Sequence, residues 1–254
     1  MEVIARIRND FPTKFGLPRQ SGLAPSLQSK IVFEPAYRVP EALRGLDGFS
    51  HIWLIWGFSA TSGTPTRAGL VERQVLSDPS ALAGSERVLP RDGGSEFHWS
   101  PTVRPPRLGG NVRMGVFATR SPFRPNPIGL SSVRLESIED DGANGRVLIV
   151  SGADLMDGTP IYDIKPYLPG VDAHPEAADG FVGAHAQQLL EVELAPELAD
   201  RLSPSQLSAL REILAQDPRP AYHATHAAPG RIYGFSYAGL DIHFTVADGR
   251  LKAF

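Results

Sequence analysis

The sequence predicts a mainly β N-terminal domain, a barrel or a sandwich, followed by a small C-terminal α+β domain. Short runs rich in β-branched and aromatic residues alternate with Gly/Pro-rich connections over the first two-thirds of the chain. Helix signals are few before residue 185, whereas a well-capped helix is predicted after residue 200. The 254 residues, 42% of them hydrophobic, suffice for one large domain or two modest ones.

Five runs in the N-terminal part have strand character. Val3, Ala5 and Ile7 share one face of the first run, and the second run, FSHIWLIWGF, is apolar on both faces, as expected of a buried strand. The expected strands are residues 3–7, 49–58, 111–117, 130–138 and 147–151, and residues 39–44 fit a short turn of helix.

The chain is expected to divide after residue 169. We assign residues 1–169 to the β domain, with a long insertion at residues 61–96, and residues 170–254 to the α+β domain. The boundary is placed there because residues 170–183 are rich in Gly, Pro, Ala and Asp.

The clearest C-terminal element is a helix over residues 203–216. Ser203 is a suitable N-cap, Pro204 occupies the first helical position, and Gln206 completes a capping box. Further elements are strands at residues 231–237, 241–246 and 251–254, and a stretch at 186–194 that fits a strand or a helix.

Composition excludes several function classes. The chain has no cysteine, which excludes disulfides, thiolate zinc sites and cysteine nucleophiles and fits a reducing compartment. No signal peptide and no apolar run long enough to span a bilayer is recognised, so we expect a cytoplasmic protein without membrane contact. No G-x-G-x-x-G loop, Walker A motif or H-E-x-x-H motif is found.

Positive charge is concentrated between residues 97 and 135. This stretch has no lysine and no acidic residue although the formal net charge of the chain is -3. Its prolines restrict the backbone, and guanidinium groups bind phosphate and carboxylate in fixed geometry. We therefore expect an anion-binding wall that contains the arginines Arg104, Arg107, Arg113, Arg120, Arg124 and Arg134.

Two other segments combine residue types that suit a site. In ADLMDGTPIYDIKPYLP the carboxylates Asp154, Asp157 and Asp163 are suited to a metal, to base catalysis or to a ribose, although Asp-Gly is also an ordinary turn pair. In AQDPRPAY an acid, an arginine and an aromatic ring follow the predicted helix. The histidines lack metal-ligand spacing, so no metal site is expected, and His51 is predicted to lie in the core.

In this order, LPRQSG, RGLDGFSHIWLIWGF, PTVRPPRLGGNVRMGVFATRSPFRPNPIGLS, DLMDGTPIYDIKPYLP and QDPRPAY resemble the TsaA/TrmO-like tRNA methyltransferase family. The resemblance runs from near the N-terminus to about Tyr222. It implies a β-barrel that binds S-adenosylmethionine (SAM) and forms a homodimer. The implied reaction is N6-methylation of threonylcarbamoyladenosine next to the tRNA anticodon.

The resemblance also implies a cofactor pocket. Where the family has a His-Gln pair after the apolar strand, this chain has Ser59 and Ala60. Arg19 or Arg120 is expected to pair with the SAM carboxylate. The cofactor residues carried over by motif are Pro18, Arg19, Gln20, Arg120, Ser132, Leu155, Met156, Asp157 and Gly158.

Roles toward the tRNA are assigned on the basis of the same resemblance. The proton acceptor is sought among Asp157, Asp217 and Tyr222, with Asp163 as a further candidate. Substrate contacts are assigned to Arg104, Arg107 and Arg113 for the tRNA backbone, and to Arg124, Asn126 and Arg219 for the modified base and its carboxylate. Two alternatives remain open at this point: an RNA-binding module without catalysis, and a metal-dependent phosphoesterase.

Overall fold

We analysed a computed structural model of the chain, which describes all residues except 59–98, 106–107, 109–111, 184–188 and 220–229. The predicted insertion at residues 61–96, the Ser59–Ala60 pair, Arg107 and Tyr222 therefore lie outside the described residues.

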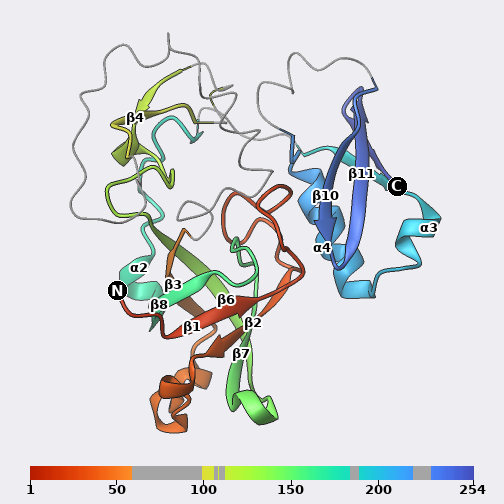
Figure 1. The fold of residues 1–254 in the computed structure, drawn as a ribbon. Coiled ribbons are helices and arrows are strands. Elements are labelled where there is room, and N and C mark those ends of the chain that lie inside the picture. Colours follow the sequence, from red (N-terminus) through yellow and green to blue (C-terminus); the bar gives the residue numbers. More distant parts are fainter. Residues whose placement is uncertain (59–98, 106–107, 109–111, 184–188, 220–229) are drawn as a thin grey trace, which may run out of the picture.

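The N-terminal part is a closed barrel of six strands (Figure 1). Around the barrel the order is β1-β2-β7-β6-β3-β8, and neighbouring strands pair antiparallel. This confirms the predicted barrel. The strands are β1 (Ala5–Arg8), β2 (Gln28–Phe33), β3 (His51–Gly57), β6 (Ile128–Asp140), β7 (Arg146–Ser151) and β8 (Pro160–Pro166).

The barrel core follows from alternation along its strands. On β3, Ile52, Leu54 and Trp56 are buried, whereas the residues between them are half-buried on the outer face. Gly129 on β6 pairs with Trp56, and the Trp56 indole occupies the space that a side chain at residue 129 would need. The run 49–58 is therefore a strand with one side in the core and the other partly covered.

Two barrel strands and one two-residue strand outside the barrel were not predicted, and one predicted strand is much shorter than expected. Strands β2 and β8 read as mixed polar and apolar segments, and they become strands because barrel closure pairs each of them on both sides. In the described part of the predicted strand at 111–117, residues 112–117, only β5 (Met114–Gly115) is a strand, and it pairs with β4 (Thr102–Val103). The chain then turns into the 3-10 helix η7 (Val116–Ala118), so that no long strand forms.

Short 3-10 helices fill the remaining connections of the barrel. The expected turn of helix at residues 39–44 is confirmed as η2 (Pro40–Leu43). The others are η1 (Pro35–Tyr37), η3 (Leu46–Gly48) and η8 (Gly142–Asn144), and the α-helix α2 (Pro169–Asp172) follows β8.

The C-terminal part is the predicted small α+β unit. Its sheet has the order β10-β11-β12-β9, with β9 parallel to β12, so the ambiguous stretch at 186–194 ends as a strand. The capping box of α4 is confirmed in both directions between Ser203 and Gln206. The elements are β9 (Glu191–Leu194), α3 (Pro196–Ala199), α4 (Pro204–Ala215), β10 (Tyr233–Tyr237), β11 (Leu240–Ala247) and β12 (Arg250–Ala253).

The loop between β1 and β2 packs into the C-terminal core. Phe11, Ala24 and Leu27 belong to the same buried cluster as the apolar side of α4 and the second sheet. Glu212 on α4 accepts hydrogen bonds from the Ser26 amide (2.8 Å) and the Ser26 hydroxyl (2.6 Å). The C-terminal unit therefore holds the loop that carries Pro18, Arg19 and Gln20.

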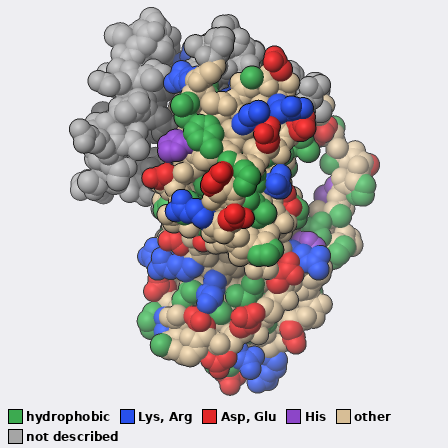
Figure 2. Space-filling model, turned by 90° about the vertical axis from the view of Figure 1, so that its right-hand side faces the viewer, with side chains coloured by type: hydrophobic (Ala, Val, Ile, Leu, Met, Phe, Trp, Pro, Cys, Tyr) green, Lys and Arg blue, Asp and Glu red, His purple; other side chains and the backbone are tan. Residues whose placement is uncertain are grey.

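Charges are mixed over much of the surface. Figure 2 shows basic and acidic side chains next to each other on the face it presents, in keeping with the net charge of -3. Net charge alone therefore gives no reason to expect that the whole molecule attracts an anionic partner.

We predict that Phe11→Ala destabilises the C-terminal unit. Phe11 is fully buried and its ring lies 4.9 Å from that of Tyr237, so the truncation leaves a cavity and should cost about 3–5 kcal/mol in the free energy of unfolding. Denaturant unfolding measures this value. Phe254→Ala is the matched control, because Phe254 is 51% exposed and should cost far less. Equal losses for both variants would contradict the packing described for the loop.

Candidate active site

The most polar cavity described lies on the outer face of the barrel. Its volume is about 500 Å³, and strands β3 and β6 form its floor. The lining residues come from the β1–β2 loop, the arginine-rich segment, the two strands, the residue after β8 and the end of α2: Ser21, His51, Trp53, Arg120, Leu130, Ser132, Tyr167 and Asp172.

The register of two strands positions the floor. Trp53 pairs with Ser132, and Ile55 pairs with Leu130. Because Ile52, Leu54 and Ser131 point into the barrel, their neighbours must point outward. Ser132 thereby joins Arg120 in one cavity, as expected for two members of the predicted cofactor set.

One end of the cavity is aromatic. The Trp53 indole donates to Asp172 Oδ2 (2.9 Å), which also accepts from the Leu168 amide (2.8 Å). These bonds fix the indole 5.4 Å from the Tyr167 ring, at an interplanar angle of 46°. The Leu168 amide and the Trp53 N–H also hold the pKa of Asp172 below its usual value, because both donate to the ionised form. Trp53 and Tyr167 were not predicted as site residues.

His51 corrects a prediction. It is not in the barrel core but half-buried on the outer face of β3, where it lines the cavity. Its Nδ1 lies 3.0 Å from the Ser50 hydroxyl, and its ring lies 6.2 Å from that of Tyr167. The apolar run around it suggested burial, but its position on the strand sets its side chain outward.

The other end of the cavity is basic. Arg120 donates to Gln20 Oε1, and Gln20 Nε2 donates to the carbonyl of Arg19 (2.6 Å). Arg19 in turn donates to the carbonyl of Arg219 (3.0 Å), while Pro18 is buried beneath the loop. The structure thus brings the LPRQSG loop and Arg120 together from positions far apart in the sequence.

Four predicted cofactor residues, Leu155 to Gly158, do not line this cavity. Leu155 is buried in the barrel core, and its carbonyl accepts from Asn9 (2.7 Å). Asp157 accepts from the Asn9 amide (3.1 Å) and lies 3.5 Å from Arg8. Gly158 has φ +76, a conformation that favours glycine, and its amide donates to Ile7. Met156 is half-buried in the same turn.

The substrate candidates fall into different environments. Arg124 donates to the carbonyls of Thr119 (2.6 Å) and Val116 (3.3 Å), so its guanidinium braces the loop around η7. Arg113 donates to the Thr102 hydroxyl (2.8 Å). Arg104 is exposed, and the Asn126 carbonyl accepts from Ile128 at the start of β6.

Asp217 and Arg219 pair with each other. Arg219 donates from Nε (2.8 Å) and Nη2 (2.7 Å) to the two carboxylate oxygens. Their side chains are only 11% and 18% exposed, for Arg219 and Asp217 respectively. The hydrogen bond to Asp217 raises the pKa of Arg219. This bidentate pair stands beside the LPRQSG loop through the Arg19–Arg219 contact.

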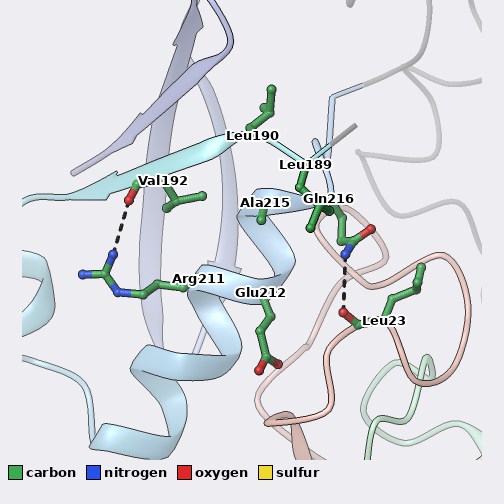
Figure 3. Close-up of a pocket in the computed structure, with 8 residues that line it drawn as sticks. All are labelled: Leu23, Leu189, Leu190, Val192, Arg211, Glu212, Ala215 and Gln216. Atoms are coloured by element: carbon green, nitrogen blue, oxygen red, sulfur yellow. Dashed lines mark hydrogen bonds between the residues drawn. The ribbon is translucent and has the colours of Figure 1, made fainter. Parts of the chain in front are cut away.

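A second cavity, of about 410 Å³, lies between α4, β9 and the loop at Leu23 (Figure 3). Its lining is mainly apolar, with Arg211 donating to the Val192 carbonyl (3.3 Å) and Gln216 to the Leu23 carbonyl (3.5 Å). The residues that line it do not include the predicted site residues.

The described residues show neither a metal cluster nor a membrane-spanning helix. Among them, no group of three or more His, Asp or Glu side chains is placed to hold a metal ion. Within the same part of the chain, no helix is long and apolar enough to cross a membrane.

Comparison with known proteins decides the family. The family model "tRNA-methyltransferase O N-terminal domain" matches residues 6–87 and 90–173, and "TrmO C-terminal domain" matches residues 187–253. The chain belongs to the TrmO family. The family prediction is therefore confirmed, and it favours the methyltransferase over the binding module and the phosphoesterase.

Relatives of the TrmO family match over the full chain. The Escherichia coli "tRNA (adenine(37)-N6)-methyltransferase" is 36% identical over 100% of this chain and 95% of its own length. A "putative S-adenosylmethionine-dependent methyltransferase RcsF" of Pseudomonas aeruginosa is 40% identical over 95% and 90%. The crystal structure of TrmO from Pseudomonas aeruginosa superposes with a TM-score of 0.67 at 31% identity, covering 100% of this chain and 97% of that one.

We predict that Asp217→Ala is destabilising. Removing Asp217 leaves the Arg219 guanidinium largely buried without its bidentate partner, which should cost about 3 kcal/mol in the free energy of unfolding. Denaturant unfolding measures the cost. Glu191→Ala is the control, because it breaks a similar pair with Arg250 whose side chains are 53% and 71% exposed and should cost under about 1 kcal/mol. Unchanged stability of Asp217→Ala would show that the pair is not a structural element.

Proposed function

We propose that this chain transfers the methyl group of SAM to N6 of adenosine 37 in tRNA, and that the adenosine carries a threonylcarbamoyl group. Membership of the TrmO family and the activity in the name of the Escherichia coli relative support the reaction. The name of the Pseudomonas aeruginosa relative supports SAM as the methyl donor. The observation that carries the proposal is the single cavity that Arg120 and Ser132 line together with the aromatic residues Trp53 and Tyr167.

The basic end of the cavity suits the cofactor. Its donors are the Arg120 guanidinium and the hydroxyls of Ser21 and Ser132. A guanidinium fits the carboxylate of an amino acid, and hydroxyls serve as donors or acceptors for a ribose or an amine. SAM, when bound, supplies a methyl group on a positively charged sulfur. Arg120, steadied by Gln20, holds the carboxylate end and thereby orients the donor.

The aromatic end suits the target base. Bases in an anticodon loop can be splayed out of their stack and read by aromatic side chains. Trp53 and Tyr167 already have fixed orientations because Asp172 and the Leu168 amide hold the indole. The side chains lose little further conformational entropy when a base stacks on them, and this small cost favours binding.

The proton on N6 is more acidic when the nitrogen bears a carbonyl substituent, so a modest base suffices. Our candidates remain Asp157, Asp217 and Tyr222. Asp217 would act while paired with Arg219. Asp157 would act from the turn held by Asn9.

Arg104, Arg107 and Arg113 are assigned to tRNA phosphates. Arg124, Asn126 and Arg219 are assigned to the modified base.

We also propose that the protein works as a homodimer in the cytoplasm, without a metal. Exposed apolar side chains between residues 117 and 130 support an interface with a second copy of the chain: Phe117 is 73% exposed, Phe123 42% and Leu130 56%. The cytoplasm is where a tRNA-modifying enzyme meets its substrate, and the absence of cysteine is compatible with it.

The function is tested with purified protein, SAM and two tRNA preparations. We expect methylation of tRNA that carries the threonylcarbamoyl group and none of the same transcript without it. Mass spectrometry of the digested nucleosides identifies the product. Equal methylation of both preparations would overturn the proposed selectivity, and methylation of neither would overturn the reaction.

The aromatic wall is tested with Trp53→Ala. Base stacking contributes about 1–3 kcal/mol per base, so we expect KM for tRNA to rise by about 5- to 100-fold. The dissociation constant for SAM should change little. Trp53→Phe keeps a ring but loses the N–H that Asp172 accepts, and should lie between the wild type and Trp53→Ala. A larger effect on SAM than on tRNA would reverse the assignment of the two ends.

A further inference from the structure

Asp154 lies where the segments of the proposed cofactor site meet. Its Oδ1 accepts from the Ser131 hydroxyl at 2.5 Å, and Ser131 precedes Ser132 on β6. The amide of Ser21, next to Gln20, faces the same carboxylate, and the charge of Arg120 acts on it. Asp154 itself precedes Leu155. Each of the four sequence blocks assigned to SAM thus has a member at or next to this side chain.

The hydrogen bond to Asp154 has a fixed direction. Trp56 donates its indole N–H to the Ser131 oxygen (3.0 Å), and an indole can only donate. Ser131 is 1% exposed and has one proton, which it gives to Asp154. Asp154 Oδ1 must therefore act as the acceptor. In the hydrogen-bonded row Trp56–Ser131–Asp154, each donated proton then has an acceptor.

The carboxylate is held in an apolar setting. Burial raises the pKa of Asp154, while the Ser131 hydroxyl, the Asp154 and Ser21 amides and the Arg120 charge oppose that rise. Neighbouring Ala153 and Leu155 are buried in the barrel core. An ionised carboxylate in such a setting lowers the stability of the fold. Ionisable residues that are destabilising in this way are concentrated at functional sites.

Asp154 does not line the cavity, so it touches neither of the proposed ligands directly. Two of its partners, Ser21 and Arg120, do line the cavity. The third, Ser131, points into the barrel but lies between the lining residues Leu130 and Ser132 in the sequence of β6. Any effect of Asp154 on the reaction must pass through these groups.

We propose that Asp154 is a positioning residue for the SAM end of the cavity. It joins β6 to the LPRQSG loop through Ser131 and the Ser21 amide, and its negative charge draws the Arg120 guanidinium to the place where the cofactor carboxylate binds. The proposal rests on the proposed function, because it assigns this end of the cavity to SAM.

The test is Asp154→Asn in the full-length chain. The amide keeps the size of the side chain but removes the charge, and it cannot accept from Ser131 and Ser21 with both of its terminal atoms. We expect the dissociation constant for SAM, measured by calorimetric titration, and KM for SAM to rise by about tenfold, the effect of losing one charge-assisted interaction. The value of kcat should stay within about twofold, and the melting temperature should not fall, because a partly buried charge is also removed.

Two further variants sharpen the test. Ser131→Ala removes the group between Trp56 and Asp154, and its effect on SAM binding should not add to that of Asp154→Asn in the double variant, since both act on one row. Asp241→Asn is the matched control. Asp241 accepts from the Ser236 hydroxyl (3.0 Å) on the exposed side of the second sheet, and its replacement should leave SAM binding unchanged.

The outcomes separate the two proposals. Unchanged SAM affinity in Asp154→Asn, or a parallel loss of affinity and melting temperature, would overturn the positioning role. Failure of the wild-type protein to bind SAM would overturn the proposed function itself. Additive effects of Asp154→Asn and Ser131→Ala would show that the two residues act separately and would also count against the role.

Discussion

The pairing of β3 with β6 is the constraint on which both the barrel and the cavity depend. Seven residue pairs join the two strands, from His51–Arg134 to Gly57–Ile128. Because successive side chains point to opposite faces, the same register sends Leu54 and Ser131 inward and Trp53 and Ser132 outward. A slip by one residue would place the indole of Trp53 in the core and empty the cavity floor. Stability and site geometry therefore share one set of backbone hydrogen bonds.

The cavity wall depends on a second, more distant support. The loop with Arg19 and Gln20 leaves the barrel after β1, yet its apolar residue Phe11 is buried in the C-terminal core. Ser26 is bound at its other end by Glu212 of α4. The C-terminal unit thus contributes to the site without lining the cavity, by fixing a loop that does.

Sequence patterns predicted the parts of the fold that carry a strong local signal. The strand around Leu54 and the capped helix α4 were recognised because apolar periodicity and Ser203 and Gln206 are properties of the segments themselves. Whether β8 and residues 111–117 form strands depends on which neighbouring strand is available for pairing. A short stretch of sequence does not determine that. Likewise Arg120 was found from its motif, whereas Trp53 was not found, because its place in the cavity depends on the register of β3 and β6. Asp154 was a candidate from its segment, but its contact with Ser131 needed the structure.

The position of β12 has a consequence for the order of folding. This strand, Arg250–Ala253, lies between β11 and β9, so the second sheet stays divided until it is in place. The Asp10–Gln206 hydrogen bond likewise joins residues 196 positions apart. Closing loops of this length costs entropy before any contact repays it, which delays such contacts relative to local ones. During synthesis the barrel strands are available long before β12. The loop with Arg19 and Gln20 can therefore pack against the C-terminal unit only in the last stage. A chain interrupted before β12 would hold a barrel whose cofactor-binding loop is not yet fixed.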